Sequence, residues 1–356
     1  MTVKEIVSGT RSGAGLFDMA HRGLLEVRGE DRVRWLDGMI SGDVQALEKE
    51  ASGSGCYATL LTNRGAIVAD FHVGRLEEGY FLESLRSEMP RIREALDRYI
   101  IADDVELIDR SDEMEVIGLE GPRSEEWLAA AVGSDWATIE SEGWRRTSIA
   151  GHPVLLGAFG FTGERAFQIR MEPADRRAVE DALLEAANGN GIVRGSFEAL
   201  EILRVEAGVP ALGAELDEDV LPPEARLERA ISTTKGCYVG QEIVARLRAR
   251  GQVNHLLVGL RLEPSDVSSR DALPAIDAPL SFEGRATGEL TSVVRSPSEG
   301  PIALGYVRRE HSEIGTVVEL DGGRATVSSL PFVEVGQHAR HGDHTPGEAA
   351  AASDPS

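Results

Sequence analysis

The stretch Met114-Glu-Val-Ile-Gly-Leu-Glu-Gly-Pro122 is an extended apolar run that ends in Gly-Pro, and a helical pattern that carries Trp127 follows it. The same order occurs earlier, where Leu24-Leu-Glu-Val-Arg-Gly29 precedes a helical pattern that carries Trp35. Each half then continues with a further strand and a second helix. We expect a duplicated α+β unit of about 90 residues, whose two similar sheets face one another because each must bury a face. A duplicated fold leaves a cleft near its pseudo-symmetry axis, which is a natural ligand site.

The sequence after Gly251 has a different pattern, in which short β-like runs alternate with Gly, Pro and Ser and no helical periodicity is found. This pattern favours a separate β-barrel or sandwich. The expected fold class is therefore α+β, with duplicated α/β-sheet units over residues 1–250 and a small C-terminal β-barrel over residues 251–335.

The last residues, 336–356, are rich in Ala, Gly, Pro and Ser, a composition that builds no core and predicts disorder. His338, His341 and His344 lie in this tail. Because no ordered scaffold would hold them, we expect these histidines to be incidental and we predict no metal site.

Composition and charge limit the possible functions. The 356 residues are 42% hydrophobic and 27% charged, as in a globular protein. No stretch approaches the ~18 apolar residues of a membrane span. The formal net charge of −23 repels phosphate backbones, so nucleic-acid binding is not expected. The two distant cysteines argue against disulfides and a structural zinc site, and we expect a cytoplasmic monomer without membrane association.

The segment Thr234-Lys-Gly-Cys-Tyr-Val-Gly-Gln-Glu242 concentrates the rarest residue types of the chain. Lys235 is one of three lysines against thirty-four arginines, and Cys237 is one of two cysteines. A thiol near a cation and a helix N-terminus is activated as a nucleophile or a metal ligand. Alternatively, the glycines form a tight entry to a helix and Cys237 is buried as a small hydrophobe. The second cysteine, Cys56, lies in an apolar β-rich run, where we expect a buried structural thiol.

Five further stretches occur in a fixed order along the chain. They are Leu16-Phe-Asp-Met-Ala-His-Arg-Gly23, Thr62-Asn-Arg-Gly-Ala-Ile-Val-Ala-Asp70, Leu119-Glu-Gly-Pro122, Gly160-Phe-Thr-Gly-Glu164 and Leu203-Arg-Val-Glu-Ala-Gly-Val-Pro210. Together they resemble signatures of the folate-binding superfamily that contains the glycine cleavage T protein, an aminomethyltransferase, and the YgfZ-type proteins. Ordered matches are more specific than one motif, and the resemblance covers residues 16–335. It implies the GcvT-like folate-binding fold and tetrahydrofolate, or another reduced folate, as the cofactor.

The segment Lys235-Gly-Cys-Tyr-Val-Gly-Gln-Glu242 is similar to the hallmark of the YgfZ-type branch, which supports the assembly or repair of iron–sulfur enzymes. The resemblance thus implies a folate-binding accessory protein whose partners are iron–sulfur enzymes or assembly factors, with Cys237 and Lys235 in its chemistry. The chain also keeps Asp70, which matches the catalytic aspartate of the T protein. The alternative is a tetrahydrofolate-dependent aminomethyltransferase or methyltransferase that uses Asp70. A third hypothesis is a folate-binding scaffold with no chemistry.

The resemblance also implies where a folate binds. Asp70 would lie beside the folate nitrogens that exchange the one-carbon unit, and would orient or protonate them. A pterin ring needs an apolar slot, for which Met19 and Phe161 are candidates. It also needs a carboxylate that accepts two hydrogen bonds from its aminopyrimidine edge. Glu206 is our candidate, because Ala207-Gly-Val-Pro210 ends a helix directly after it and would place it at a cleft rim.

The acidic glutamyl tail of a folate requires a local basic patch, which the strongly negative net charge does not provide. Arg22, Arg64 and Arg204 lie in the stretches that carry the resemblance or next to them, and we expect them to form this patch.

Overall fold

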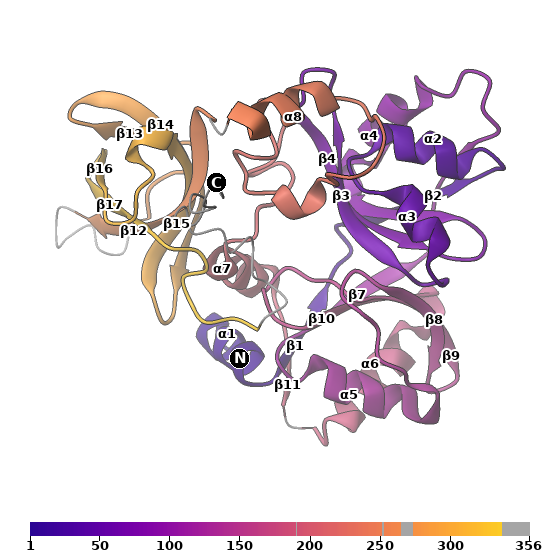
Figure 1. The fold of residues 1–356 in the computed structure, drawn as a ribbon. Helices are drawn as coiled ribbons and strands as arrows, with labels where there is room; N and C mark the ends of the chain where they lie inside the picture. The colour runs from indigo at the N-terminus through magenta and orange to yellow at the C-terminus, as the bar shows by residue number, and fades with distance from the viewer. Residues whose placement is uncertain (190, 251–252, 265–272, 337–356) are drawn as a thin grey trace, which may run out of the picture.

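The computed structural model of the protein describes residues 1–189, 191–250, 253–264 and 273–336. Its first sheet is antiparallel throughout, and three helices pack on one of its faces (Figure 1). The strand order is β3 (Gly55–Leu61), β4 (Ile67–Arg75), β5 (Tyr80–Leu85), β2 (Arg22–Arg28) and β6 (Glu106–Asp109). The helices are α2 (Arg32–Met39), α3 (Val44–Lys49) and α4 (Met89–Asp97).

The second sheet has six strands, and two helices cover its outer face. Its order is β8 (Trp144–Ile149), β9 (His152–Gly157), β10 (Ala166–Met171), β7 (Glu115–Glu120), β1 (Ala14–Asp18) and β11 (Ile192–Arg194). The helices are α5 (Ser124–Val132) and α6 (Arg176–Ala186). Only β1 and β11 pair in parallel.

The two sheets share one strand order, because β3-β4-β5-β2 in the first corresponds to β8-β9-β10-β7 in the second. In each unit a helix follows the first central strand and another follows the second, as the sequence repeat predicts. The sheets face one another with their helices on the outside. Phe81 stacks on Trp144 across the gap, with ring centroids 6.4 Å apart. The expected duplicated α+β fold is therefore confirmed.

The alternation of side chains along strand β4 decides which residues face the helices and which face the second sheet. Ala69, Phe71 and Val73 are fully buried against the helices of the first unit. The alternate residues, Asp70 and His72, point to the opposite face, toward the second sheet. Strands of a half-buried sheet usually expose such polar residues to water, but here both are buried. A polar layer therefore separates the two sheets.

The C-terminal strands form a closed six-stranded barrel, and α7 lies between it and the second sheet (Figure 1). The barrel order is β12 (His255–Pro264), β15 (Gly300–Arg308), β14 (Arg285–Ser296), β13 (Pro279–Phe282), β16 (Val317–Leu320) and β17 (Gly323–Ser328). The remaining helices are α1 (Val3–Ser12), α7 (Phe197–Ala207) and α8 (Gln241–Arg250). The expected barrel is confirmed, and none of the helices described is long and apolar enough to cross a membrane.

A proline sets the start of helix α4. The helix begins at Met89, and its N-cap residue Glu88 makes no side-chain cap bond. Pro90 in the first turn explains this start, because a proline fits a helix only where its missing N–H is not needed. The expected disordered tail, with His338, His341 and His344, lies almost wholly outside the described residues.

Candidate functional site

Six polar side chains from the facing strands form what we call the inter-sheet layer. All six are buried, and each comes from a strand whose other face packs on helices. They are Arg22, Asp70, His72 and Glu83 from the first sheet and Gln168 and Arg170 from the second. Burying polar groups costs free energy unless they are paired, so a polar interior layer indicates a site.

Asp70 is held by one hydrogen bond in this layer. The Tyr57 hydroxyl donates to its Oδ2 atom at 2.7 Å. Burial and the charge of Asp70 raise the pKa of Tyr57 well above its ordinary value, so this phenol stays a proton donor. The other oxygen of Asp70, Oδ1, is buried and has no hydrogen-bond partner among the described residues. One carboxylate oxygen is therefore fixed and the other is left for a ligand.

Glu83 joins two buried guanidinium groups from opposite sheets. Arg22 donates to both of its oxygens at 2.6 and 2.9 Å, and an Arg170 nitrogen lies 3.4 Å from Oε1. Burial alone would raise the pKa of Glu83, but these two cations lower it. Arg170 is 1% exposed, and within the described part of the chain its three guanidinium nitrogens make no hydrogen bond. Glu83 is therefore the carboxylate that the two guanidinium groups share.

Gln168 and the buried Glu120 form the next part of this region. The Gln168 side chain donates to Glu120 at 3.1 Å, and the backbone N–H groups of Phe161 and Thr162 donate to the same carboxylate at 2.9 and 3.0 Å. The Oε1 atom of Gln168 is a second buried acceptor without a partner in the described structure. Burial raises the pKa of Glu120, and these hydrogen bonds offset the shift only in part.

Replacing Glu120 by Gln should make the protein more stable at pH 7.5 but not at pH 4. A folded-state pKa raised above the unfolded value means that stability is fully present below the unfolded pKa and is lost as the pH rises. The variant removes this loss, and the Gln168 amide can turn over so that its Oε1 accepts from the new amide. Urea unfolding at both pH values tests this. An equal change at the two pH values would contradict the raised pKa.

Met19 and Phe161, the predicted apolar contacts, lie in one buried cluster beside the inter-sheet layer. The Arg22 guanidinium lies over the Phe161 ring, 4.7 Å from its centroid. A cavity of about 40 Å³ lies beside the His72 ring, which meets the Phe161 ring edge-on at a centroid distance of 5.9 Å. Its walls include His72, Glu142, Phe159, Gly160, Glu164 and Arg229. The structure therefore brings Asp70, Phe161 and Met19 into one region.

Glu206 does not lie at an open cleft rim, contrary to the sequence-based expectation. It is 1% exposed, and Arg11 donates to Oε2 at 3.0 Å while Ser296 donates to Oε1 at 2.6 Å. Its partners belong to α1 and to the barrel, and it borders a separate hollow of about 610 Å³. A pterin edge could bind Glu206 only by displacing both partners, so this carboxylate is a poor candidate.

The predicted basic patch does not form either. Arg204 is 3% exposed and binds Glu201, Glu215 and Ser292, and thereby ties α7 to the barrel. Arg22 is committed to Glu83 inside the layer, and Arg64 is exposed on the turn between β3 and β4. These arginines were grouped by sequence, but each serves a different part of the fold.

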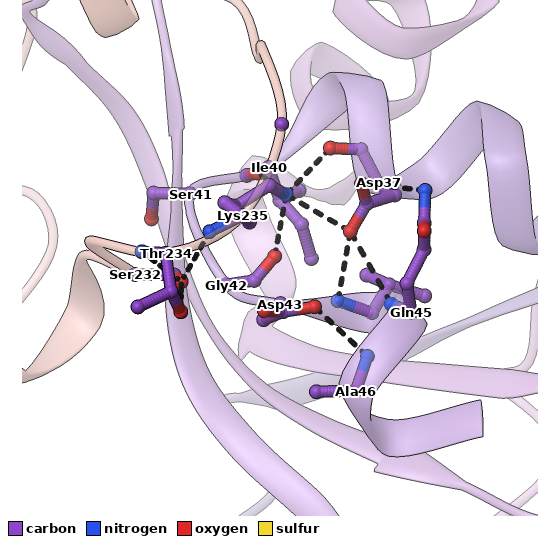
Figure 2. Close-up of polar contacts among 12 residues, drawn as sticks. Asp37, Ile40, Ser41, Gly42, Asp43, Gln45, Ala46, Ser232, Thr234 and Lys235 are labelled. Atoms are coloured by element: carbon purple, nitrogen blue, oxygen red, sulfur yellow. Dashed lines mark hydrogen bonds and ion pairs between the residues drawn. The ribbon is translucent and has the colours of Figure 1, made fainter. Parts of the chain in front are cut away.

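Lys235 is a structural clamp (Figure 2). Its ammonium donates to the backbone carbonyls of Asp37, Ile40 and Gly42 at 2.5, 2.9 and 2.6 Å, and lies 3.2 Å from the Asp37 carboxylate. These carbonyls are at the C-terminal end of α2, where the last carbonyls of a helix need donors. Burial lowers the pKa of Lys235, and Asp37 opposes that shift. The prediction that Lys235 activates a thiol is therefore not supported.

Cys237 is exposed and four residues before α8, so it is not the buried small hydrophobe that one interpretation expected. The Lys235 ammonium, its expected activator, is directed to α2 instead. Cys56 is largely buried, and this burial raises the pKa of its thiol to about 12, as expected for a structural cysteine.

Replacing Cys237 by Ser should change neither stability nor activity by a measurable amount, because the thiol is free and exposed, and substitutions of exposed residues have small effects. Thermal unfolding and the transfer assay described below check this. A loss of activity larger than about threefold, at unchanged stability, would show that Cys237 takes part in the function.

Sequence reasoning found Asp70 but missed His72, Glu83, Gln168 and Arg170. A signal for them existed, because each is a polar residue at an inward position of an otherwise apolar strand. Polar residues on the inward faces of both sheets of a duplicated fold indicate an internal site.

Known protein families match both parts of the chain. Residues 2–235 match the GCVT N-terminal domain, and residues 256–334 match the glycine cleavage T-protein C-terminal barrel domain. The aminomethyltransferase of Saccharopolyspora erythraea is 31% identical over 329 residues, or 90% of this chain and 87% of that protein. The aminomethyltransferase of Symbiobacterium thermophilum is 33% identical over 320 residues, or 87% of this chain and 82% of that protein.

Among solved structures, the glycine cleavage system aminomethyltransferase T from Bartonella henselae has the same fold. Its TM-score is 0.79 at 26% sequence identity, and the match covers 93% of this chain and 89% of that chain. These relatives correct the expectation of a YgfZ-type accessory protein for iron–sulfur enzymes, since proteins similar over most of the chain are named aminomethyltransferases. The alternative, an aminomethyltransferase-like transferase, is the supported one.

Proposed function

The chain belongs to the aminomethyltransferase family of the glycine cleavage T proteins, and we propose that it catalyses tetrahydrofolate-dependent aminomethyl transfer in the inter-sheet layer. In this reaction the one-carbon unit of an aminomethyl group passes to a reduced folate and its nitrogen leaves as ammonia. The observation that carries the proposal is the buried Asp70 carboxylate, which has one oxygen fixed by Tyr57 and one without a partner among the described residues.

The unpaired polar atoms of the layer fit the hydrogen-bonding edges of a pterin. A pterin has amide-like and amino edges, which carry both N–H donors and a carbonyl acceptor. Asp70 Oδ1 and Gln168 Oε1 are acceptors, and the Arg170 guanidinium is a donor, all without hydrogen-bond partners in the described structure. Phe161 and Met19 supply the apolar contact. These residues would hold a reduced folate.

The present cavity of about 40 Å³ is much smaller than the ~300 Å³ or more of typical ligand pockets. Binding a pterin therefore requires side chains around the cavity to move.

Asp70 has the position and the chemistry of a proton-transfer group. Tyr57 orients its carboxylate, and the surrounding sheets exclude water from it. Glu83 pairs with Arg22 at 2.6 Å and lies 3.4 Å from the Arg170 guanidinium, so both cations are held in the same layer as Asp70. An ionised carboxylate in a closed site can orient or accept a proton from the amine of the substrate.

Isothermal titration with tetrahydrofolate under anaerobic conditions tests the binding step. The wild-type protein should bind one equivalent, and Gln168→Leu should weaken binding by about 1.5 to 3 kcal/mol, the usual cost of a lost buried hydrogen-bond partner to a polar ligand. Gln45→Leu is the matched control, because Gln45 is exposed on α3 and should leave binding unchanged. Equal binding by wild type and Gln168→Leu would remove Gln168 from the site.

A further inference from the structure

The Tyr57 ring that holds Asp70 is itself fixed from two sides. The Arg229 guanidinium lies over it at 4.1 Å from the ring centroid, and the His72 ring lies 5.1 Å away. Tyr57 and His72 are also direct cross-strand partners of β3 and β4. A ring held in this way has little freedom to rotate, so its hydroxyl stays on Oδ2 of Asp70.

His72 and Arg229 are both held by Glu142. The Glu142 carboxylate lies 2.6 Å from Nδ1 of His72, and it accepts a hydrogen bond from Arg229 at 3.1 Å. His72 also stacks on Phe159, with centroids 3.9 Å apart and an interplanar angle of 6°. Contacts therefore run in a closed circuit from Glu142 through His72 and Tyr57 to Arg229 and back to Glu142.

The charge of the Glu142 carboxylate strengthens its contacts with His72 and Arg229. Burial alone would raise the pKa of Glu142, but His72 and Arg229 lower it, which keeps the carboxylate ionised. The charged and titratable groups that face His72 come from several elements. They are Glu142 from the loop before β8, Tyr57 from β3, Asp70 from β4, Glu83 from β5 and Arg229 from the segment before α8.

We propose that Glu142, His72 and Arg229 are positioning residues, which lock Tyr57 and thereby aim the free oxygen of Asp70 at the reacting amine. This inference rests on the proposed aminomethyl transfer and extends it to three residues that act on Asp70 through Tyr57. Because Glu142 reaches Tyr57 through both His72 and Arg229, it is the residue whose change disturbs the arrangement most.

Glu142→Gln tests the proposal at almost constant shape. We expect kcat for one-carbon transfer to tetrahydrofolate to fall about tenfold with KM within twofold, since a misplaced proton-transfer group affects turnover more than binding. His72→Asn retains an N–H donor toward Glu142 and should retain more activity than His72→Leu. A merely structural role would lower the melting temperature without changing kcat per folded molecule, and that result would overturn the proposal.

Nitrogen NMR of the His72 ring separates this inference from the proposed function. At one fixed pH, the chemical shifts of the two His72 ring nitrogens should change in Glu142→Gln and, through Tyr57, in Asp70→Asn, whether or not the protein transfers a one-carbon unit. If the wild-type protein shows no transfer but these shifts respond to Asp70→Asn, the proposed function is wrong and the coupling is supported. Shifts that are identical in the wild type and both variants would refute the coupling itself.

Discussion

Asp70→Asn is expected to lower the rate of one-carbon transfer from an aminomethylated carrier to tetrahydrofolate by about 100- to 10,000-fold, the range for loss of a positioned proton-transfer group. The amide keeps the size of the side chain and can still accept the Tyr57 hydrogen bond at 2.7 Å. Tetrahydrofolate binding should therefore weaken far less than turnover. The rate is measured as tetrahydrofolate-dependent release of ammonia.

The control for this experiment is Asp181→Asn, which removes an equal charge from the exposed face of α6. It should have the wild-type rate. Unchanged turnover in Asp70→Asn would mean that Asp70 is only a structural member of the layer. Tight folate binding without turnover in the wild type would instead favour the scaffold hypothesis.

Lys235→Met should lower the free energy of unfolding by about 3 to 5 kcal/mol, the usual cost of removing one partner of a buried ion pair. The side chain is 1% exposed, and its loss leaves three carbonyls at the end of α2 and the Asp37 carboxylate without their cation. Lys235→Arg should also destabilise the protein, because a planar guanidinium cannot direct donors to three carbonyls that surround a single point.

Urea unfolding measures both changes, with Lys49→Met as the control because Lys49 is exposed at the end of α3. The control should unfold like the wild type. If Lys235→Met has wild-type stability but lost activity, Lys235 belongs to the reaction and not to the framework.

The fold was predictable from sequence because the same order of strands and helices occurs twice along the chain. The strand that carries Ile117 and Leu119 and the helix of Trp127 repeat the pattern around Leu25 and Trp35, and the structure gives both units the same strand order. Less predictable was β1, which precedes the first unit but joins the second sheet. No local sequence pattern indicates which of the two sheets β1 joins, since that depends on which sheet edge is free.

The site was predictable only in part, because the rarity of a residue does not reveal its role. Lys235 stands out because lysine is rare in this chain, but its ammonium binds three convergent carbonyls and not a nearby thiol. Glu206 was predicted at a cleft rim because its helix ends there, whereas α1 and the barrel cover that end with Arg11 and Ser296. Contacts between distant segments decided both cases.

The location of a bound reduced folate tests the account most directly. We predict that a crystal structure with a stable reduced folate, such as 5-formyltetrahydrofolate, places the pterin ring within hydrogen-bonding distance of Asp70 Oδ1 and Gln168 Oε1, next to Phe161. A pterin ring bound instead in the hollow beside Glu206, between α1 and the barrel, would contradict the assignment of the reaction to the inter-sheet layer.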